Sequence, residues 1–133
     1  MESELYANKM DDVAVSTERF SLVCVDGRWK TENARGVRFT AKGIYIFVVQ
    51  YDRLFIAKRR AHRVTKEPIN HIDLAHGKMV QFAGEARFGS RRRRGMLRIW
   101  NDRTGHFYDP KRPMNPGVVP ILPRDLFERY LGF

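Results

Sequence analysis

The stretch Lys78-Met-Val-Gln-Phe-Ala-Gly-Glu-Ala-Arg-Phe88 decides the fold, because its side chains alternate with the two-residue period of a β-strand. One face of this strand carries Val80, Phe82, Gly84, Ala86 and Phe88. This face is predicted to meet the core, so that Glu85 projects toward the open side. Gly84 is expected to mark a bulge or a close approach of another backbone.

Further strands are predicted on both sides of this stretch, at residues 20–25, 37–40, 43–49, 54–57 and 96–100. Residues 43–49 are β-branched and aromatic without polar alternation, which is typical of a central strand covered on both faces. The loop 89–95 would join 78–88 to 96–100 as a hairpin. The sequence therefore predicts a mainly β fold, a twisted antiparallel sheet of five to six strands.

The chain end, residues 110–133, combines an extended strap with a predicted helix. Prolines at 110, 113, 116, 120 and 123 exclude a long helix and a central strand over most of the segment. Pro123 is expected to open a C-terminal helix that packs on the sheet. Its apolar stripe would consist of Leu126, Phe127, Tyr130 and Leu131.

A chain of 133 residues fits one domain with its own core. Residues 1–18 are polar and acidic and are expected to form a flexible arm, so that residues 19–133 make a single basic, β-rich domain. Cys24 lies in an apolar run and is expected to be a buried thiol. No run approaches the length of a membrane span, and no signal peptide is evident. We expect a soluble chain that is cytoplasmic at synthesis, with later delivery into a target cell left open.

The net charge of +10 is concentrated in the basic segment 53–103, which holds fourteen Lys and Arg against four acidic residues. Such a field attracts polyanions, so nucleic acid, a nucleotide or an acidic protein is the expected partner. A solvated surface that keeps the chain in solution is the simpler alternative. The predicted phosphate contacts are Arg59, Arg60, Arg87, Arg91, Arg92, Arg93, Arg94 and Arg98.

Three proton-transferring groups are predicted to converge at one end of the hairpin: His71, Glu85 and His106. Histidine titrates near neutrality, and a carboxylate can act as a base or orient an imidazole. Thr104 is a candidate hydrogen-bond donor. Each histidine also has a structural interpretation, in which His106 caps a turn and His71 bonds to backbone. His76 is expected to be a turn residue, and a zinc site of His71, His76 and His106 has no diagnostic spacing.

These residues follow a pattern in which the matching positions are His71, Gly77, Val80, Ala83-Gly-Glu85, Gly95, Leu97, Thr104-Gly-His-Phe107 and Pro110. The pattern resembles the module HSSFLxGxxVxxAGE…SGHYxP of bacterial polymorphic (Rhs-type) toxin and effector C-terminal domains and of plant IQ-motif proteins. The resemblance covers residues 40–110. It departs from the module at Ile72 and Asp73, where the module has serines, at Thr104 and Phe107, where it has serine and tyrosine, and by one extra residue before Pro110. It implies a toxin-like or effector-like setting, and a toxin would need an acidic immunity protein in its producer.

Three functions remain open from the residues alone. The first is metal-independent RNA cleavage, which uses both histidines and Glu85 and needs no cofactor. The second is ADP-ribosyl transfer or NAD hydrolysis, with NAD as co-substrate, Glu85 as the catalytic carboxylate, and Tyr45, Tyr51 or Phe107 against the ring. The third is a non-catalytic module that binds nucleic acid or a protein.

Overall fold

The computed structural model describes residues 4–10, 13–60 and 68–130, and strand β4 (Gly43–Gln50) is the centre of its larger sheet. This sheet has the order β5-β4-β6-β7-β8, and a smaller sheet has the order β1-β2-β3. The mainly β prediction is confirmed, and the strands divide between two sheets. Their bounds are β1 Ser21–Val25, β2 Arg28–Glu32, β3 Arg38–Thr40, β5 Arg53–Lys58, β6 Phe82–Phe88, β7 Leu97–Asn101 and β8 Phe127–Glu128.

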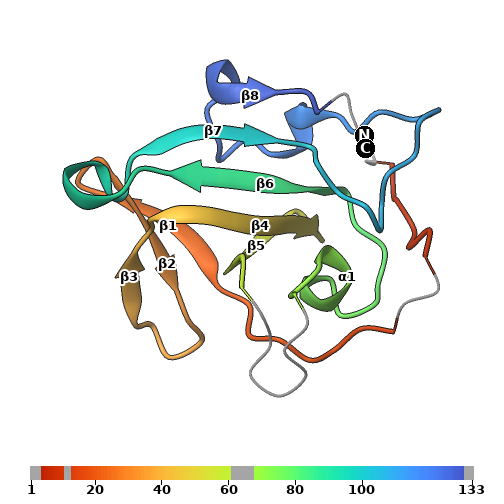
Figure 1. The fold of residues 1–133 in the computed structure, drawn as a ribbon, viewed down its shortest axis with the longest axis horizontal. Helices are drawn as coiled ribbons and strands as arrows, with labels where there is room; N and C mark the ends of the chain where they lie inside the picture. Colours follow the sequence, from red (N-terminus) through yellow and green to blue (C-terminus); the bar gives the residue numbers. More distant parts are fainter. Residues whose placement is uncertain (1–3, 11–12, 61–67, 131–133) are drawn as a thin grey trace.

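The larger sheet is antiparallel except at its last strand, since β8 pairs with β7 in parallel. Strands β6 and β7 form the predicted hairpin, and the loop between them contains the 3-10 turn η1 (Arg91–Arg93). Figure 1 shows β2 and β3 crossing the direction of β4, β6 and β7 near this loop. The two sheets join where Phe20 and Ile56 exchange backbone hydrogen bonds of 2.9 Å in both directions.

One face of the larger sheet carries an aromatic core. The rings of Phe47 and Phe82 stack with centroids 5.7 Å apart, and Trp100 lies 4.7 Å from Phe127. These positions follow from the alternation along β4, β6 and β7, which sends every second side chain to the same face. The opposite face therefore carries Glu85 and Arg87, as the sequence predicts.

The predicted C-terminal helix is wrong for the residues described. The segment instead forms a 3-10 turn, η3 (Arg124–Leu126), which leads directly into β8. The indole N–H of Trp100 donates to the carbonyl oxygen of Pro123 at 2.6 Å, and Phe127 enters the aromatic core. Pairing with β7 satisfies the backbone hydrogen bonds of β8. Phe127 belongs to the apolar stripe whose spacing is typical of a helix, but it packs on the core from a strand. The strap before it contains only the short turn η2 (Pro116–Val118).

Two further segments differ from expectation. Cys24 is exposed, not buried, because its strand runs past the core toward the turn at Asp26 and Gly27. In the segment expected to be a flexible arm, Tyr6 is only 2% exposed and exchanges backbone hydrogen bonds with Val80. Among the described residues no helix is long and apolar enough to cross a membrane.

Candidate functional site

Glu85 lies on the face of β6 opposite the aromatic core, and the backbone beside it is tightly packed. A Cβ atom on Gly84 would lie 1.9 Å from the carbonyl oxygen of Asn101 in β7, so only glycine fits there. The Glu85 amide donates to the Asn101 side-chain oxygen at 3.0 Å. The Asn101 amide group in turn lies 3.4 Å from the Glu85 carboxylate. Close approach of the two strands therefore fixes the position of the carboxylate.

Two arginines flank this carboxylate. A guanidinium nitrogen of Arg59, after β5, lies 3.2 Å from one carboxylate oxygen, and Arg103, after β7, lies 4.0 Å from the other. The Glu85 side chain is 14% exposed, whereas the two arginine side chains are 50% and 44% exposed. The carboxylate is thus sheltered, and the cations around it face solvent. Arg103 was not predicted, because nothing in its own sequence context distinguishes it from other arginines of the basic segment.

His71 opens the short helix α1 (His71–Leu74), whose first turn is held by a hydrogen bond from the Asn70 amide to the Asp73 carboxylate at 2.9 Å. The ring Nε2 of His71 lies 2.7 Å from the Gly84 carbonyl oxygen, which can only accept, so Nε2 carries a proton. Burial lowers the pKa of His71 from 6.5 to about 4; the Gly84 bond opposes this shift, and His106 and Arg59 add to it. The backbone-bonding interpretation of His71 is therefore confirmed.

His106 and Thr104 are also buried, at 5% and 2% exposed. His106 also contributes electrostatically to the lowered pKa of His71. Thr104 differs from the rest of the site, because its hydroxyl is buried and has no hydrogen-bond partner among the described residues. Through the Gly84 carbonyl oxygen the structure joins His71 to the strand that carries Glu85.

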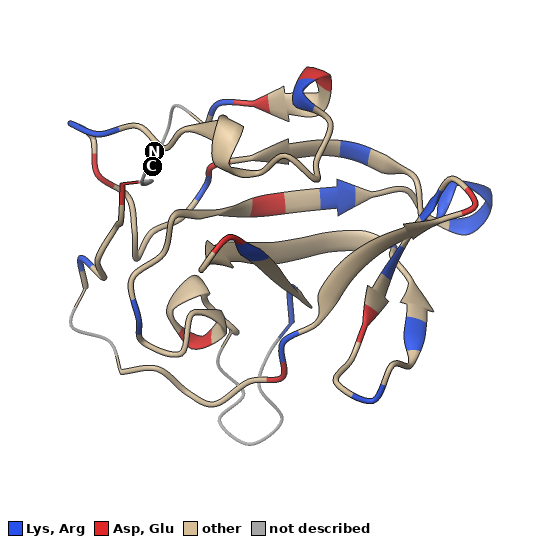
Figure 2. Cartoon of the chain, turned by 180° about the vertical axis from the view of Figure 1, so that it is seen from behind, with Lys and Arg blue, Asp and Glu red and all other residues tan. Residues whose placement is uncertain are grey.

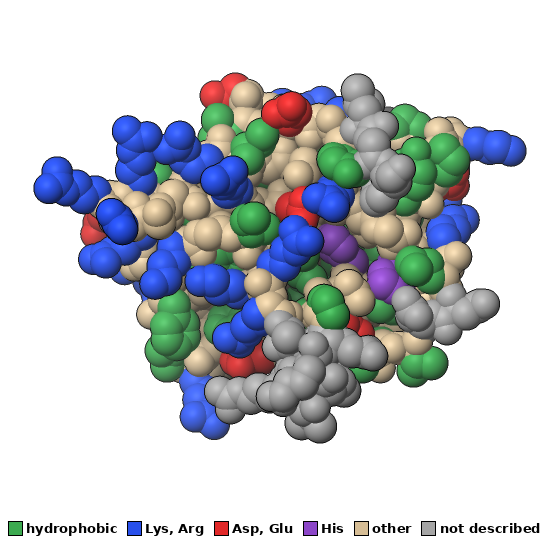
Figure 3. All heavy atoms as spheres, viewed as in Figure 1, with side chains coloured by type: hydrophobic (Ala, Val, Ile, Leu, Met, Phe, Trp, Pro, Cys, Tyr) green, Lys and Arg blue, Asp and Glu red, His purple; other side chains and the backbone are tan. Residues whose placement is uncertain are grey.

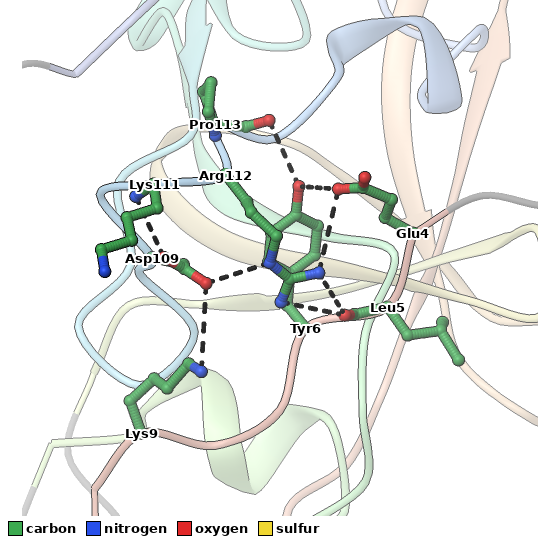
Figure 4. A network of polar contacts seen from close by, with 8 residues as sticks. All are labelled: Glu4, Leu5, Tyr6, Lys9, Asp109, Lys111, Arg112 and Pro113. Carbon is green, nitrogen blue, oxygen red and sulfur yellow. Dashed lines mark hydrogen bonds and ion pairs between the residues drawn. The ribbon is translucent and has the colours of Figure 1, made fainter.

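The N-terminal segment is bonded to the backbone at His106. The Lys9 amide donates to the His106 carbonyl oxygen at 2.6 Å. Arg112 holds the segment in place (Figure 4): its guanidinium lies 4.8 Å from the centre of the Tyr6 ring and donates to the Leu5 carbonyl oxygen at 3.4 Å. The same guanidinium donates to Asp109 at 3.0 Å and holds the pKa of that carboxyl below its ordinary value. These contacts hold the N-terminal segment against the backbone at His106.

A groove of about 1010 Å³, here called the sheet groove, runs beside Glu85 on the same face of the sheet. Its floor is a row across three strands, since Ile44 pairs with Arg87 and Arg87 pairs with Ile99. Glu85 lies two residues from Arg87, which is about 7 Å along a strand. Among the described residues, the groove's lining contains five cations and no carboxylate: the cations are Lys58, Arg59, Arg87, Arg93 and Arg98.

The predicted phosphate contacts divide between two places. Arg59, Arg87, Arg93 and Arg98 line the sheet groove, whereas Arg91, Arg92 and Arg94 line a second hollow on the other side of the β6–β7 loop. Arg60 is exposed after β5 and lines neither. Figure 2 shows the basic loop at one end of the molecule, and Figure 3 shows Lys and Arg side chains gathered over the same end.

The aromatic residues considered for a nicotinamide ring are not collected beside Glu85. Tyr45 is 6% exposed and Phe107 is fully buried. Tyr51 is 78% exposed, but it lies in the turn after β4, five residues beyond Ile46, the partner of Glu85. Five strand residues span about 16 Å. The ADP-ribosyl-transfer alternative therefore stays a prediction without support from these rings.

Of the two remaining histidines, the structure describes His76 alone. His76 is exposed in the turn after α1 with φ of 55°, which confirms it as a turn residue. His62 lies outside the described residues. Over residues 4–10, 13–60 and 68–130, no group of three or more His, Cys, Asp or Glu side chains is placed to hold a metal ion.

Comparisons of this chain with protein-family models, with curated proteins and with solved structures found no match.

Proposed function

We propose that this chain binds RNA in the sheet groove and cleaves it without a metal ion, with Glu85 as the general base. One observation carries the proposal: the sheltered Glu85 carboxylate is ion-paired at 3.2 Å to Arg59, and Arg59 also lines the groove of five cations. A phosphate held by that groove would lie beside a carboxylate. RNA is the polyanion whose backbone offers a proton next to each phosphate, on the 2′-hydroxyl.

In the proposed reaction Glu85 removes the proton of a 2′-hydroxyl, and that oxygen attacks the adjacent phosphorus. The bond from phosphorus to the 5′-oxygen breaks, and His106 supplies the proton that the leaving oxygen takes. Arg59 and Arg103 stabilise the charge that develops on the phosphorane. The products are a 2′,3′-cyclic phosphate and a free 5′-hydroxyl.

His71 is assigned a positioning role in this reaction. A ring whose pKa is about 4 is neutral at pH 7, and its one N–H is donated to the Gly84 carbonyl oxygen. It therefore cannot serve as the acid without breaking that bond. Its contact instead holds the backbone directly before Glu85, which keeps the carboxylate aligned with the groove.

The test incubates the protein with a labelled RNA strand and with the DNA strand of the same sequence, which lacks the 2′-hydroxyl. The expected result is shortened RNA ending in a cyclic phosphate, intact DNA, and a loss of about 100-fold or more in Glu85→Gln. Glu128→Gln is the matched control, because Glu128 is exposed in β8 and should leave the rate unchanged. Intact RNA, or cleavage by Glu85→Gln at the wild-type rate, would overturn the proposal.

A non-catalytic RNA-binding module is the second candidate, and the burial of the histidines favours it. His71 and His106 are 7% and 5% exposed, so a substrate has little direct access to either ring. In this case Glu85 only orders Arg59 and Arg103. RNA would then bind with a steep salt dependence and remain intact. NAD added to the same assay, with release of nicotinamide followed, tests the ADP-ribosyl-transfer alternative.

The setting implied by the resemblance belongs to the proposal as well. The chain would be made in the cytoplasm of a producer and delivered into a target cell, and an acidic immunity protein would protect the producer. The five cations of the sheet groove would form its docking surface, since opposite charge speeds association. Co-expression with the product of the neighbouring gene tests this part: an acidic partner should block RNA cleavage, whereas a neighbour that does not bind counts against it.

A further inference from the structure

The side of the β6–β7 loop away from the sheet groove is hollowed as well. This second hollow, here called the loop groove, has a volume of about 530 Å³ and lies between the loop and the three-stranded sheet. The described residues of its lining include five cations and one carboxylate, that of Asp26: the cations are Arg28, Lys30, Arg91, Arg92 and Arg94. Arg28 and Lys30 come from β2, far from the basic loop in sequence, so only the fold collects them.

The loop that separates the two grooves is held firmly by backbone contacts. Gly95 donates to the Ala41 carbonyl oxygen at 2.6 Å and accepts from the Trp29 amide at 2.7 Å. The Arg28 guanidinium donates to the carbonyl oxygens of Arg92 at 3.0 Å and Arg94 at 2.5 Å. A Cβ atom on Gly95 would lie 3.0 Å from the Arg28 side chain, so the contact is close. A fixed loop presents its charges without a large entropic cost on binding.

The charges of this loop are not neutralised within the described part of the chain. Arg91, Arg92 and Arg94 are all exposed, and none of them forms an ion pair with a described carboxylate. Adjacent guanidinium groups repel one another unless an anion lies between them. Arg93 lines the sheet groove, whereas Arg92 and Arg94 line the loop groove. The loop therefore carries a continuous row of cations from one groove to the other. This arrangement fits a chain of phosphates better than a single anion.

We infer that a single-stranded RNA crosses the β6–β7 loop and occupies both grooves. The inference rests on the proposed function and narrows its substrate to a single strand several nucleotides long. The strand must bend around a loop of a few residues to follow both grooves. A duplex resists such bending, since its persistence length is about 150 base pairs for DNA, whereas a single strand bends freely. A mononucleotide would fill one groove only.

The test measures binding by fluorescence anisotropy, with 2′-O-methyl RNA as the probe because it cannot be cleaved through its 2′-oxygen. The probes are a tetranucleotide, a single strand of about 16 nucleotides, and a duplex of the same length. The loop-groove variant is Arg91→Ala/Arg92→Ala/Arg94→Ala. The matched control removes the same charge from exposed positions that line neither groove: Arg35→Ala/Lys111→Ala/Arg124→Ala.

The loop-groove variant should bind the long strand about tenfold more weakly than the control does, and the salt slope should fall by about 2, the value for three lost phosphate contacts on a single strand. Its affinity for the tetranucleotide should equal that of the control. The wild-type protein should prefer the single strand to the duplex. Replacing the same three arginines by Lys keeps the charge and should retain most of the affinity, which separates lost charge from a misfolded loop.

Equal affinity of the loop-groove variant and the control for the long strand would overturn the inference, as would equal binding of duplex and single strand. Because the probe cannot be cleaved, this result is independent of catalysis. Normal two-groove binding together with intact natural RNA would refute the cleavage proposal alone. Cleavage that depends on Glu85, with no contribution from the loop groove, would refute only the inference.

Discussion

The imidazole of His71 donates to the carbonyl oxygen of Gly84 at 2.7 Å, and this contact joins helix α1 to the strand that carries Glu85. His71 and Glu85 belong to one stretch of the sequence. The contact that joins them runs through the Gly84 carbonyl oxygen, and it is not a catalytic pair of side chains. The burial of this histidine has a consequence for stability, because burial lowers its pKa and keeps the ring neutral.

Stability should fall as the pH drops from 6.5 to about 4. The unfolded chain takes up a proton on His71 near pH 6.5, and the folded chain does so only near pH 4. Between these values the unfolded state binds more protons, so about 3 kcal/mol of stability is lost, and the loss levels off below pH 4. Urea unfolding at several pH values measures this. His71→Gln keeps an N–H for Gly84 and should flatten the dependence; an equal slope in both proteins would contradict the assignment.

Gly84→Ala should destabilise the fold by about 3 kcal/mol or more, because the added Cβ would overlap the Asn101 carbonyl oxygen at 1.9 Å. Chemical unfolding gives the free energy. Gly105→Ala is the control, since its Cβ would meet only the Met10 sulfur at 4.0 Å, and its stability should be close to that of the wild type. Similar values for the two variants would mean that β6 and β7 do not approach so closely.

Thr104→Val should raise stability by about 1 kcal/mol, because it removes a buried hydroxyl without a partner among the described residues and keeps the shape of the side chain. Thr31→Val is the comparison, since the Thr31 hydroxyl donates to the Phe39 carbonyl oxygen and its loss should lower stability slightly. If Thr104 donates to the bound substrate, RNA cleavage falls in the more stable variant. A Thr104→Val protein less stable than Thr31→Val would show that the hydroxyl is satisfied in solution.

Arg112→Ala should loosen the N-terminal segment without unfolding the sheet. The variant loses the contacts to Asp109, the Tyr6 ring and the Leu5 carbonyl oxygen. Amide hydrogen exchange should therefore speed up at Lys9 and stay unchanged at Phe47 in β4. Under the proposed function, RNA cleavage should rise, because the segment is bonded to the backbone of the buried His106 and its release should give a substrate better access to that residue. Unchanged exchange at Lys9 would show that the segment is held by other contacts.

Much of the fold could be predicted from local periods in the sequence. Alternation along residues 78–88 indicates a strand with Glu85 on the open face, and the unbroken apolar run at 43–49 indicates the central strand. The turn-rich arginine segment predicts the β6–β7 hairpin. These features depend on the geometry of one or two neighbouring residues, which is why they can be read without a structure. The same local periods predicted a helix wrongly at Leu126 and Phe127. Their spacing is typical of a helix, but this segment forms a 3-10 turn and then pairs with the edge of β7.

Less of the candidate site than of the fold could be predicted from the sequence. The sequence by itself determined that His71, Glu85 and the arginines are present, and which face of its strand Glu85 occupies. Only the tertiary structure decided that His71 donates to backbone, that Arg59 and Arg103 flank Glu85, and that Arg28 and Lys30 join the arginine loop. The physical reason is distance along the chain. Charge, period and turn propensity belong to neighbouring residues, whereas burial and ion pairing arise only when strands far apart in sequence are packed together.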